Sequence, residues 1–375
     1  MARTLVSAAP RLVSALTGWK LFFLLLFSSL LPAQSSFVTL AKEASAARDA
    51  NRLDEAAALY RKALTLRPSW AEGWFSLGTI QYDQNSYQSA DLSFAKAVKL
   101  DPKIGTSFIM LGLCEFELGR EQAAFERLQQ GLHIGITDSQ LHDVAVFHAG
   151  VLLQRAGHFE KAQQTLYSLC STGAESDALI EALGLVALLM RDKASSAPVI
   201  RQVGHAEWQA GRQKFADARN EYSAVVQAYP QFPNIHYAYG HFLLEVRDPA
   251  PAVSEFLDEI KNQPNHVLAR LQIAAVKYRV DSAAGLPYAE RAVQLEPNLP
   301  LGHYLLGLLL LNTGDDQRAL PELEIARKLL PREAGVYYAL GTAYAHAGRT
   351  QDAAQARATF QRLQNESGTS LLPQP

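Results

Sequence analysis

Residues 74–102 read WFSLGTIQYDQNSYQSADLSFAKAVKLDP, and the proline that closes this stretch recurs at a fixed distance elsewhere in the chain. Pro68 lies 34 residues before Pro102, and Pro297 and Pro331 are again 34 residues apart. Proline cannot continue the interior of a helix, and it disfavours the α conformation of the residue before it. Each of these prolines therefore marks a predicted helix end, and the constant interval indicates a chain of repeated units.

Small residues recur in pairs whose members are twelve positions apart. Six pairs have glycine first: Gly78 with Ala90, Gly112 with Ala124, Gly150 with Ala162, Gly240 with Ala252, Gly307 with Ala319, and Gly341 with Ala353. Ala44 with Ala56 and Ala206 with Ala218 follow the same spacing. Helices joined by a short turn become antiparallel neighbours, and a small residue on each lets their backbones approach. We therefore expect these pairs to mark helix crossings, where a leucine would cost ~1–3 kcal/mol by overpacking.

Large apolar residues occupy one side of the predicted helices. In the last unit Tyr337, Leu340 and Tyr344 follow the i, i+3, i+7 spacing of an amphipathic helix. Burying one such side chain contributes about 1.5–3 kcal/mol. A single hairpin cannot cover this face alone, so neighbouring hairpins must stack on it. The predicted fold class is therefore all-α, a solenoid of stacked helix hairpins.

These positions resemble the tetratricopeptide repeat, in which an aromatic residue, Leu-Gly, a tyrosine, an alanine, a second aromatic residue, an alanine and a proline follow in order. The second unit carries the resemblance with Trp74, Leu77, Gly78, Ala90, Phe94, Ala97 and Pro102. The resemblance covers roughly residues 37–364 and implies a right-handed superhelical solenoid of about nine helix-turn-helix hairpins. The predicted segments are a signal peptide over residues 1–35, an N-terminal array of about four units over 36–175, degenerate units over 176–232, a C-terminal array of about four units over 233–364, and a flexible tail over 365–375.

Three places depart from the repeat. Between the third and fourth units the glycine interval grows from 34 to 38 residues, which predicts a longer loop within His133–His142. The fifth unit has an apolar helix over Ala178–Met190, after which the pattern predicts a shortened second helix over Ala197–Val203. The seventh unit, Leu268–Pro297, lacks the pair of small residues and has Gly285-Leu286-Pro287 near its second helix. The sequence therefore leaves open the curvature of the solenoid near residues 190–205 and its superhelical regularity near residue 280.

The N-terminal segment has the layout of a secretory signal peptide. A basic leader that ends at Lys20 precedes the apolar run Leu21–Leu31, and small residues follow this run. Eleven residues are too few to cross ~30 Å of hydrocarbon comfortably as a helix. We expect cleavage after Ala33 or Ser35 and export to the periplasm or the extracellular space. An uncleaved membrane anchor and a buried helix are the alternatives.

Charge and composition disfavour several classes of function. The formal net charge of −2 provides no long-range field that would attract nucleic acid or anionic lipid. Neither Cys114 nor Cys170 belongs to a C-x-x-C pair, so we expect buried thiols, with a single disulfide as the alternative. His236 and His241 are five residues apart, on different faces of one predicted helix. No cofactor, no metal and no catalytic site is therefore predicted, and the chain is not expected to be an enzyme.

The resemblance implies that the first helix of each hairpin lines a concave groove. In the repeat register, the residue after the first aromatic position faces this groove, at Phe75, Ile109, Phe147, Tyr237, Tyr304 and Tyr338. Aromatic anchors dominate interface energies, although in the repeat this position also packs against the adjacent unit. We expect a scaffold that binds a partner protein or an extended peptide. The alternatives are a structural or assembly component of a cell-envelope complex, and a non-catalytic accessory of an enzyme.

Overall fold

The computed structural model describes residues 31–171, 175–192 and 197–366, and the regular structure within these ranges is helical throughout. The chain divides into two compact units, Met1–Ala218 and Arg219–Pro375. The helices of the first unit are α2 (Leu31–Asp49), α3 (Leu53–Leu66), α4 (Ala71–Asp83), α5 (Tyr87–Leu100), α6 (Gly105–Glu117), α7 (Glu121–Ile134), α8 (Ser139–Arg155), α9 (Phe159–Cys170), α10 (Asp177–Ala187) and α11 (Ala197–Gly211).

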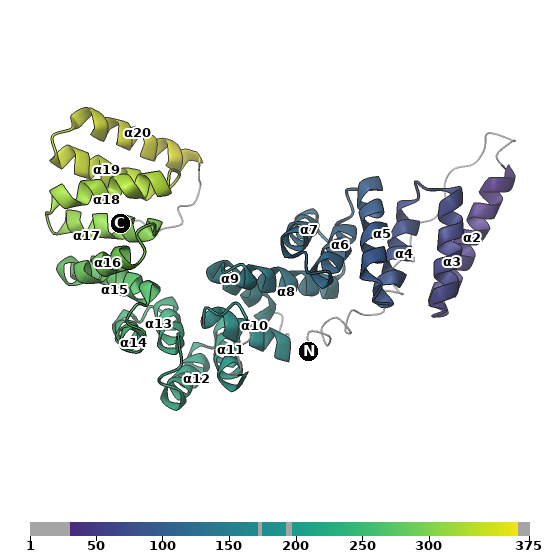
Figure 1. Cartoon of the computed structure of the whole chain (residues 1–375), viewed down its shortest axis with the longest axis horizontal. Coiled ribbons are helices and arrows are strands. Elements are labelled where there is room, and N and C mark those ends of the chain that lie inside the picture. The colour runs from purple at the N-terminus through teal and green to yellow at the C-terminus, as the bar shows by residue number, and fades with distance from the viewer. Residues whose placement is uncertain (1–30, 172–174, 193–196, 367–375) are drawn as a thin grey trace. The chain divides into compact units, whose positions relative to one another are not determined.

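The boundary between the units falls within α12 (Phe215–Ala228), inside the segment predicted to hold degenerate repeats. The second unit continues with α13 (Ile235–Glu245), α14 (Pro249–Asn262), α15 (Val267–Val280), α16 (Ser282–Leu295), α17 (Pro300–Asn312), α18 (Asp316–Leu329), α19 (Ala334–His346) and α20 (Thr350–Glu366). Within each unit consecutive helices pack on one another and stack in chain order (Figure 1). The predicted all-α solenoid is thereby confirmed.

The hairpins cross at the small residues. An added Cβ at Gly78 would lie 2.8 Å from the ring of Phe94, and one at Gly240 would lie 2.7 Å from the ring of Phe256. In both hairpins this ring stands four positions after the paired alanine. Because a methyl group would displace the ring, a large residue of the second helix packs directly on the backbone of the first. The alanines of the six glycine pairs are at most 2% exposed: Ala90, Ala124, Ala162, Ala252, Ala319 and Ala353.

The interval of 38 residues between Gly112 and Gly150 does not result in a longer loop between the third and fourth units. Four residues join α7 to α8, as many as join α5 to α6 over residues 101–104. The insertion instead lengthens α8, which has 17 residues where α6 has 13. Asp138 caps this helix, since its carboxylate accepts hydrogen bonds from two backbone N–H groups of the first turn at 2.9 and 3.1 Å. The predicted loop within His133–His142 is therefore wrong, because the extra four residues form one added helical turn.

The fifth hairpin has a full second helix. α11 has 15 residues, so the predicted short helix over Ala197–Val203 is wrong. The two helices cross with glycine on both sides: an added Cβ at Gly184 would overlap the carbonyl oxygen of Ile200, and one at Gly204 would overlap that of Ile180. Backbones this close leave no room for any side chain. The two glycines are 20 positions apart because a longer connection joins these helices, so a twelve-residue interval does not find them.

The seventh hairpin crosses at Ala274 and Gly285. These residues are eleven positions apart, because only Asp281 separates α15 from α16 whereas three residues separate α17 from α18. Ala274 is fully buried, and an added Cβ at Gly285 would lie 3.4 Å from its carbonyl oxygen and 3.0 Å from Leu309. α16 continues through Pro287. The connection is two residues shorter, and α15 is one residue longer than α17, so the irregularity here is a crossing interval shortened by one residue.

A hydrogen bond from a ring to the preceding turn recurs at the start of the first helices. In each case a ring N–H or a phenolic O–H meets the carbonyl oxygen of the proline six residues earlier, which satisfies a backbone acceptor outside the helix. The pairs are Trp74 with Pro68 (2.8 Å), His236 with Pro230 (3.0 Å), His303 with Pro297 (2.8 Å) and Tyr337 with Pro331 (3.0 Å).

Two of these rings are histidines that also bind a glutamate of the following helix. The Nδ1 atom of His236 lies 2.6 Å from Glu255, and that of His303 lies 2.6 Å from Glu322. Both nitrogens of each ring therefore face oxygen atoms, those of the glutamate carboxylate and of the proline carbonyl. Burial lowers the pKa of His236, but the hydrogen bond and the charge of Glu255, with the Pro230 carbonyl, outweigh burial and raise this pKa above its ordinary value.

Residues 1–30, with most of the predicted signal peptide, lie outside the described residues, as do residues 367–375 of the predicted tail. Among the helices that the structure describes, none combines the length and the apolar character that crossing a bilayer requires.

Candidate partner-binding face

In the first unit the three predicted groove residues belong mainly to the core. Ile109 is fully buried, so it lines no surface. Phe75 is half-buried, and its ring centroid lies 5.5 Å from that of Phe94 in the same hairpin. Phe147 is 9% exposed and meets the ring of His148 edge-on at 5.4 Å. These side chains fill space within and between hairpins, and they do not form an exposed row of aromatic rings.

In the second unit the predicted residues become more exposed toward the C-terminus. Tyr237 is 7% exposed and stacks on His266 of the next hairpin, with ring centroids 5.0 Å apart. Tyr304 is half-buried and reaches α19, where its hydroxyl occupies the space that a Cβ at Gly335 would fill. Tyr338 is 49% exposed. Only the later part of the predicted row thus has substantial surface available to a partner.

A wider surface appears where the first helices of the last three hairpins lie together. α15, α17 and α19 contact one another in sequence, and each has residues at i, i+3, i+7 and i+10 on one side. We call these twelve positions the first-helix stripe: Leu268, Leu271, Ala275 and Tyr278 on α15; Leu301, Tyr304, Leu308 and Leu311 on α17; and Gly335, Tyr338, Thr342 and Ala345 on α19. All except Leu271 are partly or largely exposed.

The register of the repeat gave only one residue of the stripe per helix, and none on α15. Tyr278 lies on α15 two turns beyond Leu271, and it was missed because the seventh hairpin has no glycine pair to set the register. The available signal was the recurrence of uncharged residues, with one tyrosine on each helix, at positions i, i+3, i+7 and i+10. Taken over three helices, this spacing indicates a continuous surface.

The tyrosine hydroxyls of the stripe include one that is held in its neutral form. Burial raises the pKa of Tyr304, and the nearby Glu333 carboxylate and Tyr278 hydroxyl raise it further. Tyr304 therefore keeps its proton at neutral pH and can donate one hydrogen bond while accepting another.

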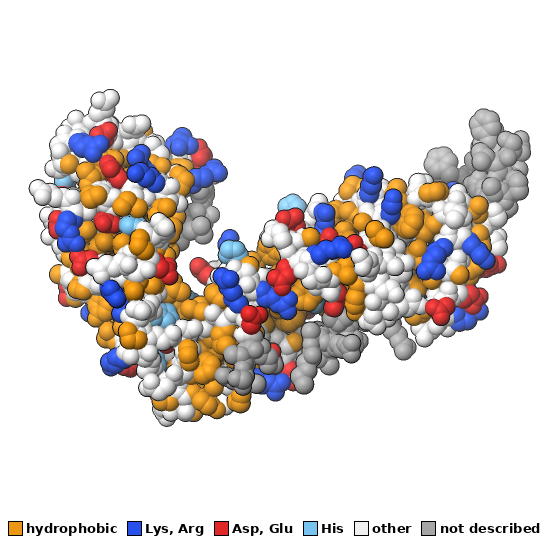
Figure 2. Space-filling view, viewed as in Figure 1, with side chains coloured by type: hydrophobic (Ala, Val, Ile, Leu, Met, Phe, Trp, Pro, Cys, Tyr) orange, Lys and Arg blue, Asp and Glu red, His pale blue; other side chains and the backbone are white. Residues whose placement is uncertain are grey.

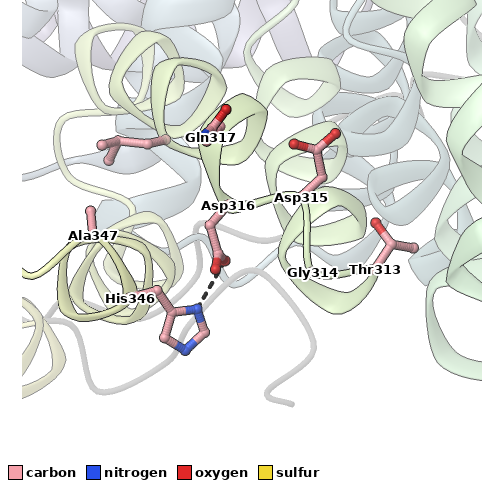
Figure 3. A pocket seen from close by; sticks show the side chains of 8 residues that line it. Thr313, Gly314, Asp315, Asp316, Gln317, His346 and Ala347 are labelled. Carbon is pink, nitrogen blue, oxygen red and sulfur yellow. Dashed lines mark hydrogen bonds and ion pairs between the residues drawn. The ribbon is translucent and has the colours of Figure 1, made fainter.

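A surface depression of about 790 Å³ lies at the edge of the last two hairpins, on the turn side. Its lining includes Asp315, Asp316 and His346, and Figure 3 shows the His346 ring and the Asp316 carboxylate pointing toward each other. The Nδ1 atom of His346 lies 2.9 Å from Asp316, and the backbone N–H of Arg318 donates to Asp315. The first of these bonds joins α18 to α19, and the second caps α18. The polar side chains that line the depression thus serve the packing of the helices, and we assign no binding or catalytic site to it.

Charged side chains on the visible face are interspersed, with lysine and arginine next to aspartate and glutamate (Figure 2). Several form exposed pairs between successive hairpins, such as Arg120 with Asp91 at 3.0 Å and Arg155 with Glu121 at 2.9 Å. Exposed pairs of this kind contribute roughly 0–1 kcal/mol each.

Among the described residues, the cysteine and histidine side chains do not form a cluster that could act as a catalytic or metal-binding site. Cys114 and Cys170 are unpaired thiols that are fully buried, and burial raises the pKa of both, that of Cys170 to about 12. His148 is buried, which lowers its pKa, and its Nδ1 atom faces the Val144 carbonyl oxygen at 2.7 Å. Within the described ranges no three histidine, cysteine or acidic side chains are placed to hold a metal ion.

Comparison with known families finds repeats in both units. The family model for the tetratricopeptide repeat matches residues 41–103, 204–267 and 304–363. The human protein O-mannosyl-transferase TMTC3 is 26% identical over 107 residues, which are 28% of this chain and 11% of that protein. The mouse protein O-mannosyl-transferase TMTC1 is 42% identical over 55 residues, which are 15% of this chain and 6% of that protein. The chain thus spans about a tenth or less of the length of these relatives.

Solved structures that align with part of this chain include MamA. MamA from Desulfovibrio magneticus RS-1, residues 41 to the end, has a TM-score of 0.43 and 21% identity, over 47% of this chain and 100% of that one. Another MamA crystal structure has a TM-score of 0.41 and 18% identity, over 43% of this chain and 95% of that one. The helix hairpins and the matches to the family model show that this chain carries tetratricopeptide repeats and folds as a tetratricopeptide-repeat solenoid.

Proposed function

We propose that this protein is a non-catalytic interaction scaffold whose second unit holds an extended segment of a partner protein along the first-helix stripe. The observation that carries the proposal is the exposure of apolar stripe residues on adjacent helices: Leu268 is 39% exposed, Leu301 46% and Tyr338 49%. Scattered apolar residues on a surface need no explanation, whereas a contiguous apolar surface is typical of an interaction site. Repeat solenoids present such surfaces over several units.

Site-specific photo-crosslinking in cells tests this proposal. A photoreactive phenylalanine analogue at Tyr338 should yield a crosslinked species that contains a second protein. The matched control places the same analogue at Val280, which is 75% exposed on α15 but lies two positions beyond the stripe residue Tyr278, on another side of the helix. Crosslinks at Val280 with no crosslinks at Tyr338 would place the partner elsewhere and overturn the proposal.

We also propose that the chain is exported. The basic leader and the apolar run Leu21–Leu31 support this proposal. Protein isolated from the extracytoplasmic fraction should begin after Ala33 or Ser35. Cytosolic protein that retains Met1 would contradict export.

A further inference from the structure

The first-helix stripe carries no charged side chain at any of its twelve positions. α17 and α19 contain no Asp, Glu, Lys or Arg at all. On α15 the three charged residues, Arg270, Lys277 and Arg279, lie at other positions than those of the stripe. In the last two hairpins the second helices differ sharply, since α18 has Asp316, Arg318, Glu322, Glu324, Arg327 and Lys328, and α20 is also charged. In these two hairpins charge is thus concentrated on the second helices, whereas in the seventh hairpin α15 has three charged residues, all off the stripe, and α16 has two.

An uncharged surface selects against a charged partner. A charged side chain that binds against leucine and tyrosine loses its hydration, which is unfavourable, and the twelve stripe positions supply no opposite charge. The Glu333 carboxylate lies at one edge of the stripe, where it accepts a hydrogen bond from the Gly335 backbone N–H at 3.3 Å. An aliphatic side chain in the same place gains by removing apolar area from water on both sides. The charge pattern therefore matches a partner segment that is itself uncharged.

The hydroxyl groups of the stripe distinguish a peptide from a lipid chain. Tyr278, Tyr304 and Tyr338 place one phenolic group on each of the three helices. The Thr342 hydroxyl donates to the Tyr338 carbonyl oxygen at 3.4 Å and can still accept a hydrogen bond. A peptide backbone carries N–H and C=O groups that must be paired when they leave water, and neutral hydroxyls can pair with either. A hydrocarbon chain has no hydrogen-bonding groups and therefore cannot pair with these hydroxyls.

The dimensions fit a short extended segment. Three neighbouring helices, with axes about 8–10 Å apart, span roughly 20 Å, which about six extended residues cover at ~3.3 Å per residue. In an extended chain alternate side chains point to the same face. We infer that the stripe binds an uncharged extended segment with aliphatic side chains at alternate positions. This inference rests on the proposed scaffold function, and it adds the chemistry of the partner.

Fluorescence anisotropy with defined probes tests the inference. The first probe is a labelled ten-residue peptide, blocked at both ends, with leucine at alternate positions and serine or glycine between them. In the second and third probes glutamate or lysine replaces a central leucine, whose side chain is on the face of the peptide that contacts the stripe. The full chain should bind the neutral probe at least ~10-fold more tightly than either charged probe. A difference of this size is expected when one well-buried anchor is lost or one unpaired charge is buried.

Two variants locate the binding. Leu301→Lys places a charge in the stripe and should weaken binding of the neutral probe by ~10-fold or more. Val280→Lys introduces the same charge off the stripe and should leave binding within about twofold. Both positions are exposed, and circular dichroism and thermal melting verify that both variants fold.

Three outcomes would overturn the inference. A charged probe that binds as tightly as the neutral one, and depends on Leu301, would leave the scaffold function intact and show that the partner chemistry is wrong. Failure of the neutral probe to bind would also reject the inferred chemistry, while the crosslinks at Tyr338 report separately on the scaffold function. Binding of neutral phosphatidylcholine vesicles that is lost in Leu301→Lys would identify the stripe as a lipid surface instead.

Discussion

Replacing Gly184 by alanine should splay the fifth hairpin, because the added Cβ would overlap the carbonyl oxygen of Ile200. The same Cβ would lie 2.9 Å from the carbonyl carbon of Ile200 and 3.1 Å from the nitrogen of Gly204. These atoms all belong to the backbone of α11, so no change of rotamer relieves the overlap. Alanine gains roughly 0.5–1 kcal/mol over glycine inside a helix, whereas overpacking costs typically about 1–3 kcal/mol and occasionally more. A backbone clash belongs at the upper end, so we expect a net loss of about 2–3 kcal/mol.

Gly341 provides the matched control. It also lies at a helix crossing, but an added Cβ there would meet first the flexible, exposed Arg357 side chain, at 3.1 Å, and then the Ala353 carbonyl oxygen, at 3.7 Å. The arginine can move, so Gly341→Ala should be neutral or stabilise the second unit by up to ~1 kcal/mol.

Hydrogen exchange measured by mass spectrometry suits this comparison, because it reports the opening free energy of α10 and α11 separately from that of α19 and α20. It also avoids the assumption that a chain of two units unfolds in a single step. Unchanged protection of α10 in Gly184→Ala would refute the close backbone approach. An equal loss of protection at α19 in Gly341→Ala would show that glycine replacement is disruptive at any crossing.

Three further predictions concern buried polar groups and thiols. The folded-state pKa of His236 is raised, so its ion pair with Glu255 should stabilise the folded protein fully below pH ~6.5. This stabilisation should be lost progressively as the pH rises through the folded-state pKa of His236. The difference in melting temperature between the wild type and His236→Gln should therefore shrink over that pH range. Glu259→Ala should destabilise by roughly 1–3 kcal/mol in thermal melting, because this fully buried carboxylate accepts hydrogen bonds from two backbone N–H groups at the start of α13. The neighbouring change Asp258→Ala removes a half-buried carboxylate that pairs with the exposed Lys261, and it should cost less than ~1 kcal/mol. Cys114 and Cys170 should resist iodoacetamide at neutral pH until the chain is denatured, as measured by mass spectrometry; rapid labelling of the native protein would contradict their burial.

The hairpins could be predicted from the sequence because their constraints act over a short, constant distance. A helix crossing requires small residues, and a three-residue turn fixes twelve positions between Gly307 and Ala319. Where the connection changes length the interval changes too. The crossings at Gly184 with Gly204 and at Ala274 with Gly285 obey the same physical rule at other spacings. The insertion before Gly150 was placed in a loop, although the cap at Asp138 allows it to extend the helix.

The groove residues could not be predicted in the same way. The position after the first aromatic residue holds Ile109 in the core and Tyr338 at the surface, although both have the same register. The burial of that position depends on the size of its neighbours in adjacent hairpins, which the repeat pattern does not constrain. Summing exposure over neighbouring helices requires the structure.

The absence of charge from the first-helix stripe is a stronger indication of function than any single aromatic residue in it. Buried crossing residues such as Gly307 and Leu323 are fixed by packing, so their identity reports on folding alone. Leu301 is 46% exposed, and a lysine there would keep its charged end in water at little cost to the fold. Folding therefore does not exclude charge from the exposed positions of the stripe, while α18 and α20, the second helices of the last two hairpins, accept charge freely. A partner segment that displaces water from these positions would exclude charge from all of them at once.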